Sequence, residues 1–194
     1  LRGQVYELTG VEPEYYFDMG FLDFVQFIDA LGGVTVNVPV DMSLKDVMTG
    51  DWIELSAGEQ TLDGAQALVF SRVRKIFAAA QDACRQMDDR SVVASVLNYI
   101  ANNPDAIEQG VSALYDNAET NWDRAEFTAL VEDFAKNADK FTILSGTGPY
   151  DGDIDGDTGQ WMAYRDEGTW HQIIETVDAG GDPTEIVGLP YQAV

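Results

Sequence analysis

A helical apolar pattern that runs directly into an alternating one, across two glycines, sets the fold class of this chain. The apolar residues of the first pattern recur at helical spacing: Phe21, Phe24, Val25, Ile28 and Leu31. Gly32 and Gly33 follow them and supply the left-handed stop that ends many helices. Val34, Val36 and Val38 then alternate with polar residues, as in a strand with one buried face. A helix joined this tightly to a strand indicates an α/β domain.

The spacing of apolar residues predicts further helices and strands. Helices are predicted over 64–72, from 88–91 to just before Pro104, through 107–114, through 127–134 and over 169–177, and short strands near 15–18, 141–144 and 161–164. Asp63 and Asn121 stand where a helix N-cap is expected. Between 41 and 58 the pattern weakens, which indicates a long loop that covers the core through Met42, Leu44, Val47 and Trp52.

The length and composition fit one domain with a sizeable core. The chain has 194 residues, of which 45% are hydrophobic, and we expect a domain over 1–178 and a tail over 179–194. Cys84 is the only cysteine, so no internal disulfide can form, and we interpret it as a small packing residue. No apolar run is long enough to predict a membrane span. The start at Leu1, without a methionine, indicates a processed or truncated product.

Basic residues concentrate in one short stretch of an acidic chain. The formal net charge is −23, yet five of the eleven basic residues fall within one short stretch: Arg72, Arg74, Lys75, Arg85 and Arg90. Even scatter would place about one there. The 34 Asp and Glu residues repel nucleic-acid phosphates, so we do not expect nucleic acid as a partner. The stretch instead indicates a site for a smaller anion.

Two interpretations of this basic stretch stay open from spacing alone. In the first, Arg72 and Arg74 present their guanidiniums from the end of a helix or from extended chain, while Arg85 and Arg90 face them from the N-terminus of the next helix. Such a set makes a phosphate or pyrophosphate cradle. In the second, the arginines form structural ion pairs with the neighbouring acids Asp82, Asp88 and Asp89.

A second candidate site lies at Asp151, Asp153 and Asp155. The segment 151–157 matches the opening of an EF-hand calcium loop, with oxygen ligands at alternate positions followed by Gly156. Met162 stands where the loop needs its last glutamate, and the flanks indicate strands rather than paired helices. An acidic, solvated turn is therefore the alternative to a weak calcium site. The only histidine, His171, lies in a predicted amphipathic helix and is interpreted as a surface or packing residue.

A set of segments, in matching order and spacing, is more specific than any of these features alone. The segments are Tyr16-Phe17-Asp18 with Phe21, Ile28–Val36, Gly58–Leu68, Arg72-Val73-Arg74 and Asp82–Arg85. Together they resemble the second half of the catalytic domain of the LytR-CpsA-Psr family of cell-envelope proteins. The resemblance covers most of residues 1–178, more loosely after residue 104.

The resemblance implies a three-layer α-β-α sandwich around a mixed central sheet, with the amino-terminal half of the domain missing from this chain. It also implies an extracytoplasmic phosphotransferase of cell-wall biogenesis, which moves a glycopolymer from a polyprenyl-pyrophosphate carrier onto peptidoglycan. The family's motif arginines hold the pyrophosphate, which carries over here to Arg72, Arg74 and Arg85. Asp82 matches the motif carboxylate and either orients Arg85 or helps to take a proton from the acceptor hydroxyl; a pure salt-bridge role is the alternative.

Two departures from the family pattern matter. The family's preceding half, with its membrane anchor and the acidic ligands of Mg²⁺, is absent from this chain, so the metal is expected from the family while its ligands are expected elsewhere. The family also has an Arg-Gln pair three residues after the motif arginine, whereas Asp88 and Asp89 stand here and Arg90 fills the role only with a two-residue slip.

The runner-up interpretation is a non-catalytic extracytoplasmic envelope module that binds carbohydrate or calcium. An apolar groove for a polyprenyl tail, beside the arginines, would distinguish the enzyme from this module.

Overall fold

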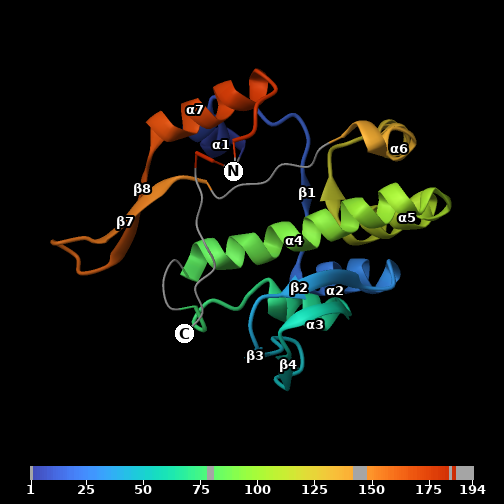
Figure 1. The fold of residues 1–194 in the computed structure, drawn as a ribbon, viewed down its shortest axis with the longest axis horizontal. Coiled ribbons are helices and arrows are strands. Elements are labelled where there is room, and N and C mark those ends of the chain that lie inside the picture. The colour runs from blue at the N-terminus through green and yellow to red at the C-terminus, as the bar shows by residue number, and fades with distance from the viewer. Residues whose placement is uncertain (1, 78–80, 142–147, 184, 187–194) are drawn as a thin grey trace. The chain divides into compact units, whose positions relative to one another are not determined.

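The computed structural model describes residues 2–77, 81–141, 148–183 and 185–186, which fall into two compact units (Figure 1). Of the described residues, the smaller unit combines 2–14 with 148–183 and 185–186, and the larger one holds 15–77 and 81–141. The predicted strand over 141–144 lies, except for its first residue, outside the described part of the chain.

The larger unit holds most of the helices and strands. In chain order these are β1 (Phe17–Asp18), α2 (Phe21–Ala30), β2 (Val34–Val38), β3 (Met42–Lys45), β4 (Trp52–Leu55), β5 (Gly58–Leu62), α3 (Gly64–Phe70), α4 (Gln81–Asn102), η1 (Pro104–Ala106), α5 (Ile107–Asn117), β6 (Glu119–Thr120), α6 (Arg124–Lys136) and η2 (Ala138–Lys140). Helix α2 packs against α3 and α5, and α4 packs against β2 and α6 (Figure 1).

The turn between α2 and β2 confirms the first prediction. Gly32 and Gly33 adopt φ angles of 84° and 99°, a left-handed conformation that glycine adopts without strain. A side chain at Gly33 would also lie 2.7 Å from the carbonyl oxygen of Leu62. In β2 the residues alternate between buried and exposed, as the sequence predicts.

The strands pair in two-stranded antiparallel sheets. In the described residues the pairs are β1 with β6, β2 with β5, β3 with β4, and β7 with β8 of the smaller unit. The α/β fold class is confirmed. The described residues nonetheless form no mixed sheet: β3 and β4 make a hairpin between β2 and β5, so the chain returns to β2 in the antiparallel direction.

The core of the larger unit joins α2, α3 and α4 to the β2–β5 pair. Its most deeply buried side chains include Ile28, Val38, Leu62, Val69 and Phe70. Cys84 of α4 is also fully buried, in keeping with its interpretation as a packing residue. The position of α3, and of the arginines that follow it, is therefore fixed by side chains from several elements.

Residues 41–58 form a hairpin rather than the predicted long loop. Met42 and Leu55 pair across β3 and β4 and are buried, so Met42 covers the core as predicted. Trp52 and Val47 do not, because the outer face of this short hairpin is open to solvent and Trp52 is 63% exposed. Because few residues of β3 and β4 are buried, apolar and polar residues hardly alternate in their sequence. This explains why the two strands are not predicted.

Two helix starts differ from the prediction. Helix α6 is capped by Asp123, whose side chain accepts hydrogen bonds from the backbone of Ala125 and Glu126. Asn121 lies two residues earlier, and its side chain instead accepts a hydrogen bond from the Tyr16 backbone. Helix α4 begins at Gln81, earlier than the predicted start at 88–91. It ends at Asn102, just before Pro104, as predicted.

The smaller unit is a hairpin with two helices. It contains α1 (Arg2–Thr9), β7 (Tyr150–Ile154), β8 (Trp161–Arg165) and α7 (Glu167–Asp178). Helices α1 and α7 pack together. The predicted strand at 161–164 and the predicted closing helix are confirmed. No helix in the described ranges combines the length and apolar character needed to cross a membrane.

Candidate functional site

The segment that carries Arg72 and Arg74 begins where α3 ends. Asp63 caps α3 as predicted, accepting a hydrogen bond from the Gln66 backbone, and the Gln66 side chain accepts one from the Asp63 backbone. The helix ends at Phe70, so Arg72 lies just beyond its last turn rather than inside it.

The chain after α3 makes turns rather than an extended strand. Val73 and Phe77 point into the core and are almost completely buried. Their burial fixes the segment, while Arg74 between them is exposed to solvent.

The first turns of α4 bring Asp82, Arg85 and Asp89 onto one face of the helix. Arg85 Nε donates a hydrogen bond of 3.1 Å to Asp82 Oδ1, and Arg85 Nη1 pairs with Asp89 Oδ2. These partners are three and four residues apart, the spacing at which helical side chains meet. Arg85 is therefore held between two carboxylates of its own helix.

Asp82 also joins the two motif arginines. Arg74 Nη1 lies 3.7 Å from Asp82 Oδ1, the same oxygen that accepts from Arg85. Gln86 Nε2 donates a 2.9 Å hydrogen bond to the other oxygen of Asp82. The R-x-R and D-x-x-R motifs, eight residues apart in sequence between Arg74 and Asp82, thus meet at one carboxylate.

The two acids in this network respond differently to their surroundings. Partial burial disfavours the charge of Asp82, but hydrogen bonds from Gln86 and Arg85 and the nearby arginine charges outweigh it, so the pKa of Asp82 falls below its ordinary value. Burial dominates for Asp89 and raises its pKa, although Arg85 and a hydrogen bond from Ser71 act in the opposite direction. Asp82 is the firmly ionised acid, and Asp89 is the one whose charge is disfavoured.

The pKa of Arg85 is raised, which matches its position between two acids. Its partial burial works against the charge, yet the hydrogen bond to Asp82 and the charge of Asp89 prevail. Arg85 therefore stays cationic at every relevant pH.

Arg72 makes its contacts in a different place. Its guanidinium carbon lies 5.0 Å from the ring centroid of Phe21, the first residue of α2. Its charge also contributes to the lowered pKa of Asp46, which is set mainly by a hydrogen bond from the Met48 backbone. The structure thus joins Arg74 to Arg85 through Asp82, and places Arg72 over an aromatic ring beside the β3–β4 hairpin.

Arg90 does not lie at a helix N-terminus, contrary to the prediction. Because α4 begins at Gln81, Arg90 is in its interior, and Arg85 lies in the second turn. Five residues separate the two arginines, which places them roughly 140° apart around the helix. The prediction that Arg85 and Arg90 together face one anion from a helix N-terminus is therefore wrong.

Sequence reasoning also missed two polar partners of the site. These are Gln86, which donates to Asp82, and Ser71, which bonds Asp89. Gln86 stands four residues after Asp82, so the spacing would have revealed it had the helix start been placed correctly. Ser71 comes from another element, and no local spacing signals its contact.

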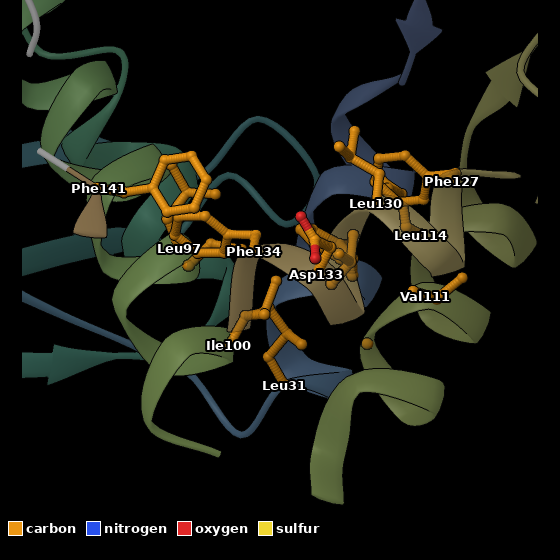
Figure 2. Close-up of a pocket in the computed structure, with 14 residues that line it drawn as sticks. Leu31, Leu97, Ile100, Val111, Leu114, Phe127, Leu130, Asp133, Phe134 and Phe141 are labelled. Atoms are coloured by element: carbon orange, nitrogen blue, oxygen red, sulfur yellow. The ribbon is translucent and has the colours of Figure 1, made fainter. Parts of the chain in front are cut away.

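An apolar pocket lies further along α4. It has a volume of about 350 Å³. Residues of α2, α4, α5 and α6 line it, and Figure 2 shows how their side chains surround the pocket. Its lining is apolar except for Asp133 and comprises Phe27, Leu31, Val96, Leu97, Ile100, Gly110, Val111, Leu114, Phe127, Leu130, Val131, Asp133, Phe134 and Phe141. Val96 follows Arg85 by eleven residues, which is about three helical turns and roughly 16 Å, so both lie on nearly the same face of α4.

The candidate calcium segment forms the β7–β8 hairpin and its turn. Asp155 accepts hydrogen bonds from the Asp157 backbone and from both the backbone and hydroxyl of Thr158. The Thr158 bonds are the main cause of its lowered pKa. These bonds are typical of an acidic turn in which a side-chain carboxylate accepts hydrogen bonds from the next residues of the turn.

The Mg²⁺ that the family implies binds oxygen ligands such as carboxylates. Across the part of the chain that the structure describes, no three His, Cys, Asp or Glu side chains are gathered as a metal would need. Asp82 and Asp89 are instead bound to arginine and amide donors. The described residues therefore do not fit a magnesium site, and no chemical step below is derived through the metal.

Comparisons with known proteins identify relatives of this chain. The chain is 30% identical over 160 residues to the cell wall biosynthesis protein LcpA of Corynebacterium glutamicum, which covers 75% of this chain and 30% of LcpA. It is 28% identical over 186 residues to the polyisoprenyl-teichoic acid–peptidoglycan teichoic acid transferase TagU of Oceanobacillus iheyensis, which covers 95% of this chain and 52% of TagU. The chain thus spans about half or less of the length of these curated relatives.

Solved structures share the fold. Bacillus subtilis TagV matches with a TM-score of 0.74 at 23% identity, over 90% of this chain and 66% of TagV. A LytR-Csp2A-Psr enzyme from Actinomyces oris matches with a TM-score of 0.61 at 20% identity, over 90% of this chain and 66% of that one. A model of the LytR_cpsA_psr family matches residues 1–174. This chain belongs to the LytR_cpsA_psr family.

Proposed function

We propose that this chain is part of a phosphotransferase-type ligase that moves a glycopolymer from a polyprenyl-pyrophosphate carrier onto peptidoglycan, in the cell envelope outside the cytoplasm. The observation that carries the proposal is the convergence of Arg74 and Arg85 on Asp82, on the face of α4 that leads to an apolar pocket. The names of LcpA and TagU support the cell-wall setting. A membrane anchor for the whole protein is part of the proposal.

The site has the two chemical characters that such a carrier requires. Guanidinium groups bind phosphate oxygens in pairs, so Arg74 and Arg85 suit the pyrophosphate. An apolar pocket suits the prenyl tail, which cannot hydrogen-bond. Because Arg85 and Val96 share a face of α4, one elongated, amphiphilic ligand can use both ends of that face.

The transfer itself is a substitution at phosphorus. An acceptor hydroxyl of peptidoglycan attacks the phosphorus that carries the glycopolymer, and a new P–O bond forms. The bond from that phosphorus to the bridging oxygen breaks, polyprenyl phosphate leaves, and the hydroxyl proton passes to a base. Arg74 and Arg85 hold the negative charge of the pyrophosphate during this step.

Asp82 is better suited to orient Arg85 than to act as the base. A general base works best when its pKa lies near the working pH, and the pKa of Asp82 is lowered from an already acidic value. Its oxygens are also engaged by Arg74, Arg85 and Gln86. We therefore assign Asp82 the role of fixing the two arginines for the pyrophosphate.

Calorimetric titration with geranyl pyrophosphate and with inorganic pyrophosphate tests the proposal. Arg85→Ala should weaken the binding of both ligands by about 1–3 kcal/mol, the range for a hydrogen bond between charged groups. Arg124→Ala, which removes a half-exposed arginine that pairs with Glu108 on α5, is the matched control and should bind as the parent does. Equal losses in the two variants would contradict a specific anion site.

The pocket is tested by the same two ligands. Leu130 lines the pocket yet is 51% exposed, so Leu130→Asp places a charge in the pocket at little cost to the core. Leu130→Asp should weaken the binding of geranyl pyrophosphate and leave the binding of inorganic pyrophosphate unchanged. Val93→Asp, at a similarly exposed position of α4 outside the pocket, should change neither. If Leu130→Asp binds both ligands normally, the tail does not use this pocket.

A further inference from the structure

The basic site of this chain is largely neutralised by its own acids. Two guanidiniums, those of Arg74 and Arg85, stand against two carboxylates, those of Asp82 and Asp89, which leaves no net positive charge in the network. An incoming pyrophosphate is highly charged and meets both carboxylates at close range. Anion binding should therefore become stronger when one acid gives up its contact with an arginine.

Asp89 is the acid that can more easily give up its contact with Arg85. Asp82 is tied by donors from three residues, Arg74, Arg85 and Gln86, and its pKa is lowered. Asp89 contacts Arg85 and Ser71, and burial raises its pKa. The charged groups that act on Asp89 are Arg85 and Asp82 of its own helix, while Ser71 reaches it from the end of α3.

We propose that Asp89 is a specificity-determining residue, which occupies the Nη1 side of Arg85 and competes with the pyrophosphate of the ligand for that guanidinium. The inference rests on the proposed function and adds a residue to it. Removing the charge of Asp89 should open Arg85 and tighten anion binding.

The competition also gives Asp89 a second state. When ionised, it can only accept, so it repels the phosphate oxygens. When protonated, it becomes a hydrogen-bond donor toward the same oxygens. Asp89 therefore selects for ligands able to displace a carboxylate, such as a pyrophosphate that spans both arginines, over single weakly charged groups.

Inorganic pyrophosphate binding to Asp89→Asn, Asp89→Glu and the parent chain tests this inference. Asp89→Asn keeps the shape but not the charge, and we expect affinity to rise about two- to fivefold, the scale of one partly exposed ion pair. Asp89→Glu keeps the charge and should bind within about twofold of the parent. Asp139→Asn, at an exposed position on η2, removes one negative charge elsewhere and controls for the charge of the whole chain.

The outcomes separate this inference from the proposed function. A gain in affinity cannot arise from misfolding, so tighter binding by Asp89→Asn alone supports the competition. The gain should also shrink as the pH falls toward the pKa of Asp89, because the parent then loses the same charge. Binding by the parent with no gain in Asp89→Asn, or an equal gain in Asp139→Asn, overturns the inference while the proposed function stands. No pyrophosphate binding by any of the proteins overturns both.

Discussion

Gly64, the first residue of α3, sits against the backbone of α2. A Cβ atom added there would lie 2.2 Å from the carbonyl oxygen of Val25 and 2.8 Å from its carbonyl carbon and Cα. All three atoms belong to the backbone, so no side-chain rotation can relieve the overlap. In addition, the Gly64 backbone donates a 2.8 Å hydrogen bond to Asp29 Oδ1 of α2. Gly64→Ala must therefore push α3 away from α2.

The magnitude follows from three opposing terms. Overpacking a well-filled site costs about 1–3 kcal/mol. A shift that breaks the Asp29 hydrogen bond, which involves a charged group, adds roughly 1–2 kcal/mol. Replacing glycine by alanine in a helix returns about 0.5–1 kcal/mol. We therefore expect Gly64→Ala to lower the free energy of unfolding by about 1–4 kcal/mol.

Urea denaturation followed by circular dichroism measures this loss, with Gly110→Ala as the matched control. Gly110 is also a buried helical glycine, but a Cβ there would meet only Leu31 Cδ2, at 3.4 Å. Gly110→Ala should be neutral or more stable by up to about 1 kcal/mol. Because α3 leads into Arg72 and Arg74, Gly64→Ala should also weaken pyrophosphate binding. If the two variants unfold at the same urea concentration, α3 does not approach α2 as closely as described.

Two further changes test local features of the larger unit. The folded pKa of Asp82 is lowered, so its contribution to stability is present above its ordinary value of 3.8 and is lost as the pH falls through the folded pKa. Asp82→Asn should thus unfold about 0.5–1 kcal/mol more easily than the parent at neutral pH, and a urea series should show this difference shrinking as the pH falls below 3.8; a difference that stays constant would refute it. Asp123→Ala removes the N-cap of α6 and should cost about 1 kcal/mol in thermal unfolding, whereas Asp123→Asn retains an acceptor and should cost little; equal losses would argue against the cap.

The elements that the sequence predicts well are those whose signals are local. The alternation of Val34, Val36 and Val38, the glycines before them and the cap at Asp63 each rest on the geometry of a few neighbouring residues. These local preferences agree with the packing of the core, so the folded structure keeps the helix, turn and strand that they predict. The helix–turn–strand unit, and hence the α/β class, could be read in this way.

The start of α4 could not be predicted from apolar spacing, for a physical reason. The first turns of this helix carry Asp82, Arg85, Gln86 and Asp89, whose polar bonds at three- and four-residue spacing link successive turns. Apolar periodicity begins to dominate only near Val92. A helical turn that is stabilised by ion pairs shows no apolar periodicity. The three- and four-residue spacing of its opposite charges nonetheless indicates a helix. Because apolar spacing places the start of α4 too late in the chain, it also places Arg90 at a helix end.

The two interpretations of the basic stretch, an anion site and a set of ion pairs, turn out to be compatible. The side chains of Arg85, Asp82 and Asp89 are 28%, 36% and 38% exposed, and that of Arg74 is 57% exposed. Ion pairs with this much solvent access contribute little, about 1 kcal/mol or less each. A pyrophosphate that bridges two guanidiniums gains more than one such pair supplies. The ion pairs therefore hold the arginines in place without binding them too tightly to exchange, and the charge of Asp89 sets how easily that exchange occurs.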